Sequence, residues 1–160
     1  MDKAIFVTKY YPFAVRAAKA FKIQNAGVIL AQAAHESAWG TSFSATNRKN
    51  FFGLTAAGSP NQYWDGSKSA SKTNPKLLFR VYKSELDSFM DYARLLSTKY
   101  HAAAEQSKNV AEFAKAISQS AYISESNGDN RSAYENAIVS NSSFITETLK
   151  KNLKLIQQVM

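Results

Sequence analysis

Glu36 is the residue whose type and position in this sequence best suit acid–base chemistry. It follows a predominantly apolar run, with Gln32 one helical turn before it and Trp39 about one turn after it. Partial burial beside such a helix disfavours the ionised carboxylate, raises its pKa and keeps a proton available near neutral pH. A carboxylic acid in that state suits general-acid protonation of a glycosidic oxygen. The alternative is a structural role, in which Glu36 caps a neighbouring backbone or pairs with Arg48.

Aromatic side chains gather in and beside the parts of the sequence that do not look helical. Flat rings with polar edges suit the apolar faces and hydroxyl rims of sugars, although aromatic residues more often belong to the core. Tyr63 and Trp64 precede Asp65 in a polar stretch, which is an unusual setting for core residues. These two residues therefore favour a carbohydrate-binding cleft, whereas Phe51, Phe52 and Tyr82 also suit the core. The whole set of aromatic residues is Trp39, Phe51, Phe52, Tyr63, Trp64, Tyr82 and Tyr122.

Two helices are expected to position Glu36. Apolar residues recur at helical spacing over residues 3–21, and Pro12 predicts a break in that helix. Asn25 is suited to cap a second helix, which is apolar almost all round and is therefore expected to be central and buried. Gly40 offers a C-terminal stop for this second helix.

An irregular excursion follows. Residues 52–80 are rich in Gly, Pro, Ser, Asn and Lys, which does not favour a helix, while residues 77–82 have the composition of a strand. The pattern predicts a long loop or a small ragged hairpin that lies over one side of the helical body. Long irregular segments in compact domains are more often functional than idle.

Helical patterns resume after the excursion. Ser84 and Asn109 each begin a capping pattern ahead of apolar residues at helical spacing, and a last helix is expected to start near Ser142 or Ser143. With 160 residues and 45% apolar content, the chain is predicted to form one domain over residues 1–160.

The composition excludes several other classes of site. There are no cysteines, and His35 and His101 lack the four-residue spacing of a zinc metalloprotease, so we expect no metal site built on thiolates or histidines and no cofactor. An all-oxygen cation site stays open. The net charge of +8 suits an anionic partner such as a bacterial wall. The basic residues alternate with Glu and Ser instead of clustering, so we expect a solvated surface and no nucleic-acid partner. No apolar run is long enough for membrane insertion, and the first residues do not form a signal peptide.

Several blocks of sequence together resemble the glucosaminidase family, glycoside hydrolase family 73, which includes the muramidase domain of flagellar rod-assembly proteins. They occur in family order over roughly residues 3–140, and their combination is far more specific than any one of them. The blocks are residues 31–40 (AQAAHESAWG), 50–54 (NFFGL), 79–82 (FRVY) and 88–96 (SFMDYARLL), followed by Tyr122 and Tyr134.

The resemblance implies a lysozyme-like α-lobe, a small β-lobe over approximately residues 53–83, and a groove for glycan between them. Glu36 matches the general acid of the family, and Tyr122 matches a tyrosine near the catalytic centre that would bind substrate or steady the transition state. Family members cleave the β-1,4-linked strands of peptidoglycan, and most are described as endo-β-N-acetylglucosaminidases. We expect substrate contacts from Gln32, Ser37, Trp39, Asn50, Phe52, Tyr63, Trp64 and Tyr134.

One departure from the family pattern leaves the mechanism open. Many members carry a second acid in the β-lobe, but residues 67–76 contain none, and Asp65 is the nearest candidate. Asp65 would orient water for inversion, or the substrate's own acetamido group would attack with assistance from Tyr122. A third route brings Glu125 or Asp129 into the groove.

Other functions remain open at the level of the sequence. A muramidase or a lytic transglycosylase would also use one glutamate, and a wall-binding module would keep the groove without turnover. The expected place of action is the cell wall, in the periplasm or outside the cell, reached by a route other than a signal peptide in this chain or after trimming. If the protein is a secreted effector, an immunity or secretion partner that fills the groove is expected.

Overall fold

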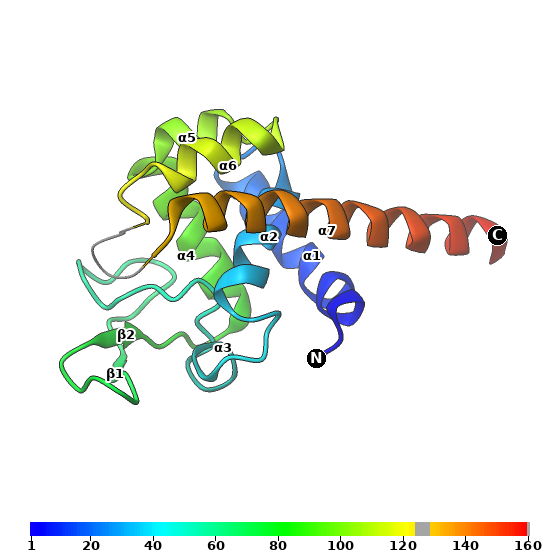
Figure 1. Cartoon of the computed structure of the whole chain (residues 1–160). Helices are drawn as coiled ribbons and strands as arrows, with labels where there is room; N and C mark the ends of the chain where they lie inside the picture. The colour runs from blue at the N-terminus through cyan, green and yellow to red at the C-terminus, as the bar shows by residue number, and fades with distance from the viewer. Residues whose placement is uncertain (124–128, 160) are drawn as a thin grey trace.

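The chain folds into a helical lobe and a smaller lobe around a two-stranded hairpin (Figure 1). The computed structural model describes residues 1–123 and 129–159. This architecture confirms the predicted helical α+β fold with a small β-lobe. The elements are α1 (Lys3–Ala20), α2 (Ala26–Glu36), α3 (Phe43–Arg48), β1 (Lys68–Ala70), β2 (Leu78–Arg80), α4 (Glu85–Thr98), α5 (His101–Glu105), α6 (Val110–Ser118) and α7 (Arg131–Val159).

Helix α2 lies at the centre of the helical lobe because nearly all of its residues are apolar. Its N-terminus is capped by the Asn25 side chain, which accepts a hydrogen bond from the backbone N–H of Gly27. Every residue from Val28 to Ala34 is buried, and α2 packs against both α1 and α7. This burial fixes the direction of the helix, so that its last residue, Glu36, faces the small lobe.

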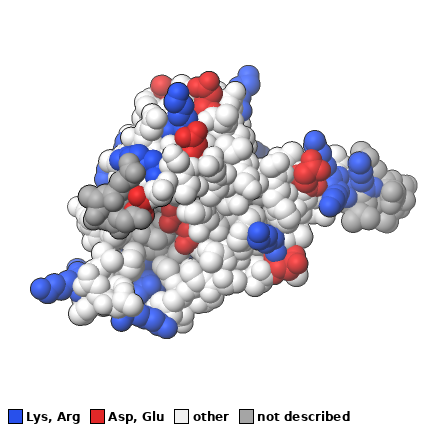
Figure 2. Space-filling view, in the orientation of Figure 1, with Lys and Arg blue, Asp and Glu red and all other residues white. Residues whose placement is uncertain are grey.

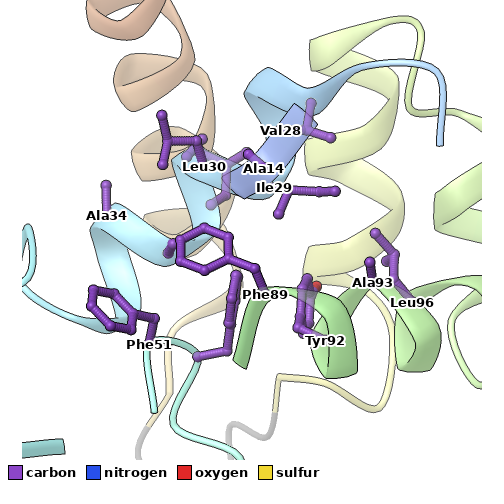
Figure 3. Packing of buried hydrophobic residues seen from close by; sticks show 14 of the residues in the cluster. Ala14, Val28, Ile29, Leu30, Ala34, Phe51, Phe89, Tyr92, Ala93 and Leu96 are labelled. Atoms are coloured by element: carbon purple, nitrogen blue, oxygen red, sulfur yellow. The ribbon is translucent and has the colours of Figure 1, made fainter. Parts of the chain in front are cut away.

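Aromatic rings join the segment after α3 to helix α4. The ring centroid of Phe89 lies 5.6 Å from that of Phe51 and 5.2 Å from that of Phe52. Phe52 also stacks on Tyr92, with centroids 4.2 Å apart and planes inclined by 9°. Figure 3 shows Phe51, Phe89 and Tyr92 in one layer beneath the buried side chains of α2. The backbone that follows Phe52 is therefore held against the core.

The small lobe is attached to α4 through a buried ionic network. Strands β1 and β2 pair antiparallel, and the strand predicted within residues 77–82 is confirmed at Leu78–Arg80. Asp91 of α4 is fully buried, and its carboxylate binds the guanidinium of Arg80 at 2.6 Å. The same carboxylate accepts hydrogen bonds from Tyr82 at 2.5 Å and from Arg94 at 3.0 Å. A buried charge with this many partners is stabilising only while the set stays intact.

Helix α1 runs without interruption through Pro12, so the predicted break in it is wrong. Proline removes one backbone hydrogen bond inside a helix and crowds the preceding turn. Tyr10 and Ala14, on either side of Pro12, are both buried in the core. Tertiary packing on both sides therefore outweighs the local preference of Pro12.

Helix α7 begins at Arg131 and not near Ser142, which corrects the predicted start. The side chain of Asn130 accepts a hydrogen bond from the backbone N–H of Ala133, as a capping residue does. Tyr134, Ile138 and Ile145 are buried along one face, so the apolar stripe begins well before the Ser-rich stretch. The weak helix formers at 140–143 favour a helix boundary by their local preference, but α7 continues through them. No helix within the described residues is long and apolar enough to cross a bilayer.

Candidate active site

Glu36 is the last residue of α2, and a tight turn after it directs the chain away from the helix axis. The hydroxyl of Ser37 donates to the carbonyl of Ala33 at 2.5 Å and accepts from the N–H of Gly40 at 2.8 Å. Ala38 and Trp39 both adopt left-handed backbone conformations, with φ of 49° and 55°. Such conformations are costly for residues other than glycine, so they indicate a turn that the surrounding structure enforces.

An open depression of about 450 Å³ contains Glu36 and separates the end of α2 from the small lobe. The Glu36 side chain is half-buried, so it is partly shielded yet still reached by solvent. Asp129 is the other acidic residue among those described around this depression. The lining residues are His35, Glu36, Phe52, Gly53, Leu54, Thr55, Lys99, Tyr100, Ala121, Tyr122, Ile123, Asp129 and Tyr134.

Three tyrosines and a buried glutamine form a hydrogen-bonded support for this depression. The hydroxyl of Tyr92 donates to Oε1 of Gln32 at 2.6 Å, and Nε2 of Gln32 donates to the hydroxyl oxygen of Tyr134 at 3.1 Å. The hydroxyl of Tyr122 donates to the carbonyl of Phe52 at 3.1 Å. The pKa values of all three tyrosines are raised, chiefly by burial, so their hydroxyls stay protonated as donors.

Burial is the largest single influence on the Glu36 carboxyl, whose pKa is raised to about 7. The negative charge of Asp129 acts in the same direction, while hydrogen bonding by Tyr134 and Tyr122 acts in the opposite direction. A substantial fraction of Glu36 is therefore protonated at neutral pH, as a general acid requires. Burial lowers the pKa of the neighbouring His35, whereas Asp129 raises it.

Gly53 lets the loop after α3 approach the Glu36 carboxyl closely. Its φ is +64°, and a Cβ built there would lie 3.7 Å from Oε2 of Glu36. The loop is held by Asn50, whose side-chain amide donates to the carbonyls of Leu54 at 2.9 Å and Arg80 at 3.1 Å. Glycine in this position combines a left-handed backbone with access to the carboxyl.

Asp65 lies outside the depression that contains Glu36. Its carboxylate accepts a hydrogen bond from the N–H of Ser67 at 2.9 Å and pairs with Lys83 at 3.5 Å. These contacts lower its pKa, as expected for an exposed turn residue. Asp129, in contrast, lines the same depression as Glu36. Glu125, the other distal acid that we considered, lies outside the described residues.

The structure brings some of the predicted substrate-binding residues together and separates others. Phe52 and Tyr134 line the depression, and Gln32 lies directly behind them. Ser37 and Asn50 are buried within the turns described above, and Trp64 is buried with Nε1 donating to the carbonyl of Ser67 at 2.8 Å. Two further residues lie elsewhere: Trp39 packs on Phe6 and Phe144, and Tyr63 packs on Phe21.

Several lining residues were not singled out from the sequence. Thr55, Lys99 and Tyr100 come from two separate segments, and nothing in their local sequence marks them as neighbours of Glu36. The one available signal was the change of pattern at Lys99 and Tyr100, where α4 ends before α5. Within residues 1–123 and 129–159, no three His, Asp or Glu side chains gather closely enough to hold a metal ion.

Comparison with known proteins identifies the family of this fold and depression. The family model for glucosaminidase, described as mannosyl-glycoprotein endo-beta-N-acetylglucosaminidase, matches residues 11–146. A search of curated protein sequences finds no significant match.

Solved structures share the fold over nearly the whole chain. The glycoside hydrolase domain of Salmonella typhimurium FlgJ is 25% identical, with a TM-score of 0.73 over 99% of this chain and 97% of that one. A peptidoglycan hydrolase from Sphingomonas sp. A1 is 25% identical, with a TM-score of 0.67 over 92% and 94% of the two chains. A type VI secretion system effector-immunity complex from Pseudomonas protegens shares the fold at 21% identity, with a TM-score of 0.65 over 90% and 94%. The chain therefore belongs to the glucosaminidase family and is a glycoside hydrolase.

Proposed function

We propose that this protein cleaves the β-1,4-linked glycan strands of bacterial peptidoglycan after N-acetylglucosamine, with Glu36 as the general acid. The observation that carries the proposal is the half-buried Glu36 carboxyl, whose pKa is raised to about 7 in an open depression beside tyrosine hydroxyls. Family membership supplies the reaction class, and the similar peptidoglycan hydrolase of Sphingomonas sp. A1 supports the choice of substrate.

In the proposed reaction Glu36 donates its proton to the glycosidic oxygen while the bond from that oxygen to the anomeric carbon breaks. The carbonyl oxygen of the acetamido group on the same sugar attacks the anomeric carbon and closes a cyclic oxazolinium. Water then attacks the anomeric carbon, the ring opens, and the proton of the water returns to Glu36. Tyr122 and Tyr134 line the depression, and in this reaction their hydroxyls would contact the reacting sugar.

The substrate-assisted route is favoured over a water-activating Asp65 because Asp65 faces Ser67 and Lys83 away from the depression. Inverting enzymes require a carboxylate base opposite the acid with room for one water between them. Asp129 is the described acid that shares the depression, and we assign it an electrostatic role on Glu36. A variant of Asp129 that lost activity as completely as Glu36→Gln would instead identify Asp129 as the base.

The test is digestion of purified peptidoglycan with the wild type and with Glu36→Gln, followed by borohydride reduction and mass spectrometry of the products. Reduced N-acetylglucosamine ends that disappear in the variant are the expected result. Reduced muramic acid would make the enzyme a muramidase, and anhydro ends would make it a lytic transglycosylase. Binding of wall fragments without any cleavage by the wild type would contradict the catalytic proposal and favour a binding module.

The place of action and any protein partner are part of the same proposal. A substrate in the cell wall requires action in the periplasm or outside the cell. The Pseudomonas protegens effector-immunity complex shares only the fold with this chain, so an immunity partner stays a prediction. A partner of that kind would cover the depression around Glu36 and inhibit cleavage, which a digestion assay in its presence measures directly.

A further inference from the structure

A second depression continues the one that contains Glu36. Its volume is about 530 Å³, and it lies between the loop before β1 and the C-terminal part of α4. Four residues line both depressions, so the two form one continuous groove: Leu54, Thr55, Lys99 and Tyr100. No Asp or Glu is among the described residues that line this second part, which we call the α4 arm of the groove.

The α4 arm carries an excess of positive charge. Three cationic side chains line it, Arg80, Arg94 and Lys99, and the carboxylate that contacts the two arginines is the buried Asp91. Arg80 is bound by Asp91 at 2.6 Å and is itself buried, so its charge is matched. Arg94 shares the same carboxylate at 3.0 Å and keeps 30% of its side chain exposed. Among the described residues, one negative charge therefore faces three positive charges.

Lys99 is the cation that lies where the two depressions meet. It is exposed, and its Nζ lies 5.6 Å from the centre of the Tyr100 ring. Among the residues that the structure describes, Lys99 has no acidic partner within ion-pair distance. An exposed ammonium beside a groove is available for an anionic ligand.

Lysines are also present elsewhere on the surface. Figure 2 shows blue side chains over the β1–β2 hairpin and along the projecting end of α7, so positive charge alone does not mark a site. The α4 arm differs because its charge lies inside a depression continuous with Glu36. A ligand held there would be joined to the sugar at the reaction centre.

We propose that the α4 arm binds carboxylates of the peptide stem that peptidoglycan carries on its muramic acid residues, through Lys99 and Arg94. This inference rests on the proposed function. The sugars of the strand bear no net charge once the lactyl group is amidated, whereas the stem peptide carries free carboxylates. The excess positive charge beside the catalytic depression therefore selects for strands that still carry their stems.

The experiment compares the kcat/KM of cleavage on two substrates prepared from the same sacculi after removal of phosphate-containing wall polymers. One keeps its stems. The other has lost them by amidase treatment, and the lactyl carboxylate that the amidase exposes is then coupled to methylamine, so that its sugars stay uncharged as they are in the stem-bearing strand. The wild type is expected to prefer the stem-bearing strands, and Lys99→Gln is expected to reduce this preference by about two- to fivefold, which is the range for a partly exposed ion pair. Lys99→Arg should restore the preference, and about 1 M salt should abolish it because charges are then screened within a few ångströms.

Lys108→Gln is the matched control, because Lys108 is exposed and lines neither part of the groove. It should leave the preference of the wild type unchanged. Equal kcat/KM values for the two substrates, or a preference that Lys99→Gln does not reduce, would overturn the stem-binding inference while leaving the glycosidase proposal intact. Failure of the wild type to cleave either substrate would instead refute the proposed function. If Lys108→Gln also lost the preference, the effect would depend on the net charge of the protein and not on a site in the groove. That result would overturn the inference as well.

Discussion

Replacement of Glu36 by Gln tests the raised pKa on which the proposed acid depends, because a desolvated carboxyl also affects the stability of the fold. The ordinary pKa of this carboxyl is 4.5, and burial raises it to about 7 in the folded protein. Between these values the folded chain keeps a proton that the unfolded chain has released. The free energy of unfolding therefore falls as pH rises through this window.

The magnitude follows from the two pKa values. Below 4.5 Glu36 is protonated in both states and carries no penalty, and above about 7 the penalty is complete. Each unit of difference between the folded and unfolded pKa values corresponds to about 1.4 kcal/mol, so the two values for Glu36 correspond to about 3 kcal/mol. Because Glu36 keeps some contact with solvent, we expect about 1 to 3 kcal/mol. A glutamine side chain cannot ionise, so the Glu36→Gln variant avoids this penalty at high pH.

Urea unfolding of the wild type and of Glu36→Gln at about pH 4 and about pH 8.5 measures the effect. As pH rises from the lower to the higher value, the free energy of unfolding of the variant should increase relative to that of the wild type. The variant loses glycosidase activity at the same time. Glu112→Gln, which removes an exposed carboxylate from α6, controls for the change in net charge. A stability difference between Glu36→Gln and the wild type that is the same at both pH values would refute the raised pKa and the argument for Glu36 as the acid.

Three further variants test the surroundings of the acid. Asp129→Asn removes a charge that raises the pKa of Glu36, so the fall of kcat/KM at high pH should move to lower pH while the maximum is largely kept; an unmoved profile would contradict the coupling. Gln32→Leu removes the hydrogen bond to Tyr134 and leaves buried hydroxyls unpaired, so we expect a loss of about 1 to 3 kcal/mol in urea unfolding and a lower kcat. Asp91→Ala leaves buried arginine charge without its carboxylate and should cost about 3 to 5 kcal/mol; a near-neutral result in urea unfolding would refute the structural role of the network.

The expectations that came from local pattern agree well with the fold. Capping by Asn25 and the apolar composition of residues 26–34 predicted a buried central helix, and α2 is that helix. The expectations that failed were also local. Pro12 predicts a break that α1 does not have, and the Ser-rich stretch at 140–143 predicts a helix start where α7 is already continuous. In both places burial of one helix face, which involves residues far apart in the sequence, outweighed the preference of a short segment.

The sequence by itself determined the family, the fold class and Glu36 as the residue to consider first. A carboxyl at the end of an apolar helix is a local feature, and the family blocks are local as well. Only the tertiary structure decided that Asp129 and Lys99 share the groove with Glu36, while Asp65 and Trp39 do not. The physical reason is that a pKa and a binding surface depend on what packs within a few ångströms, and those neighbours come from segments that only folding brings together.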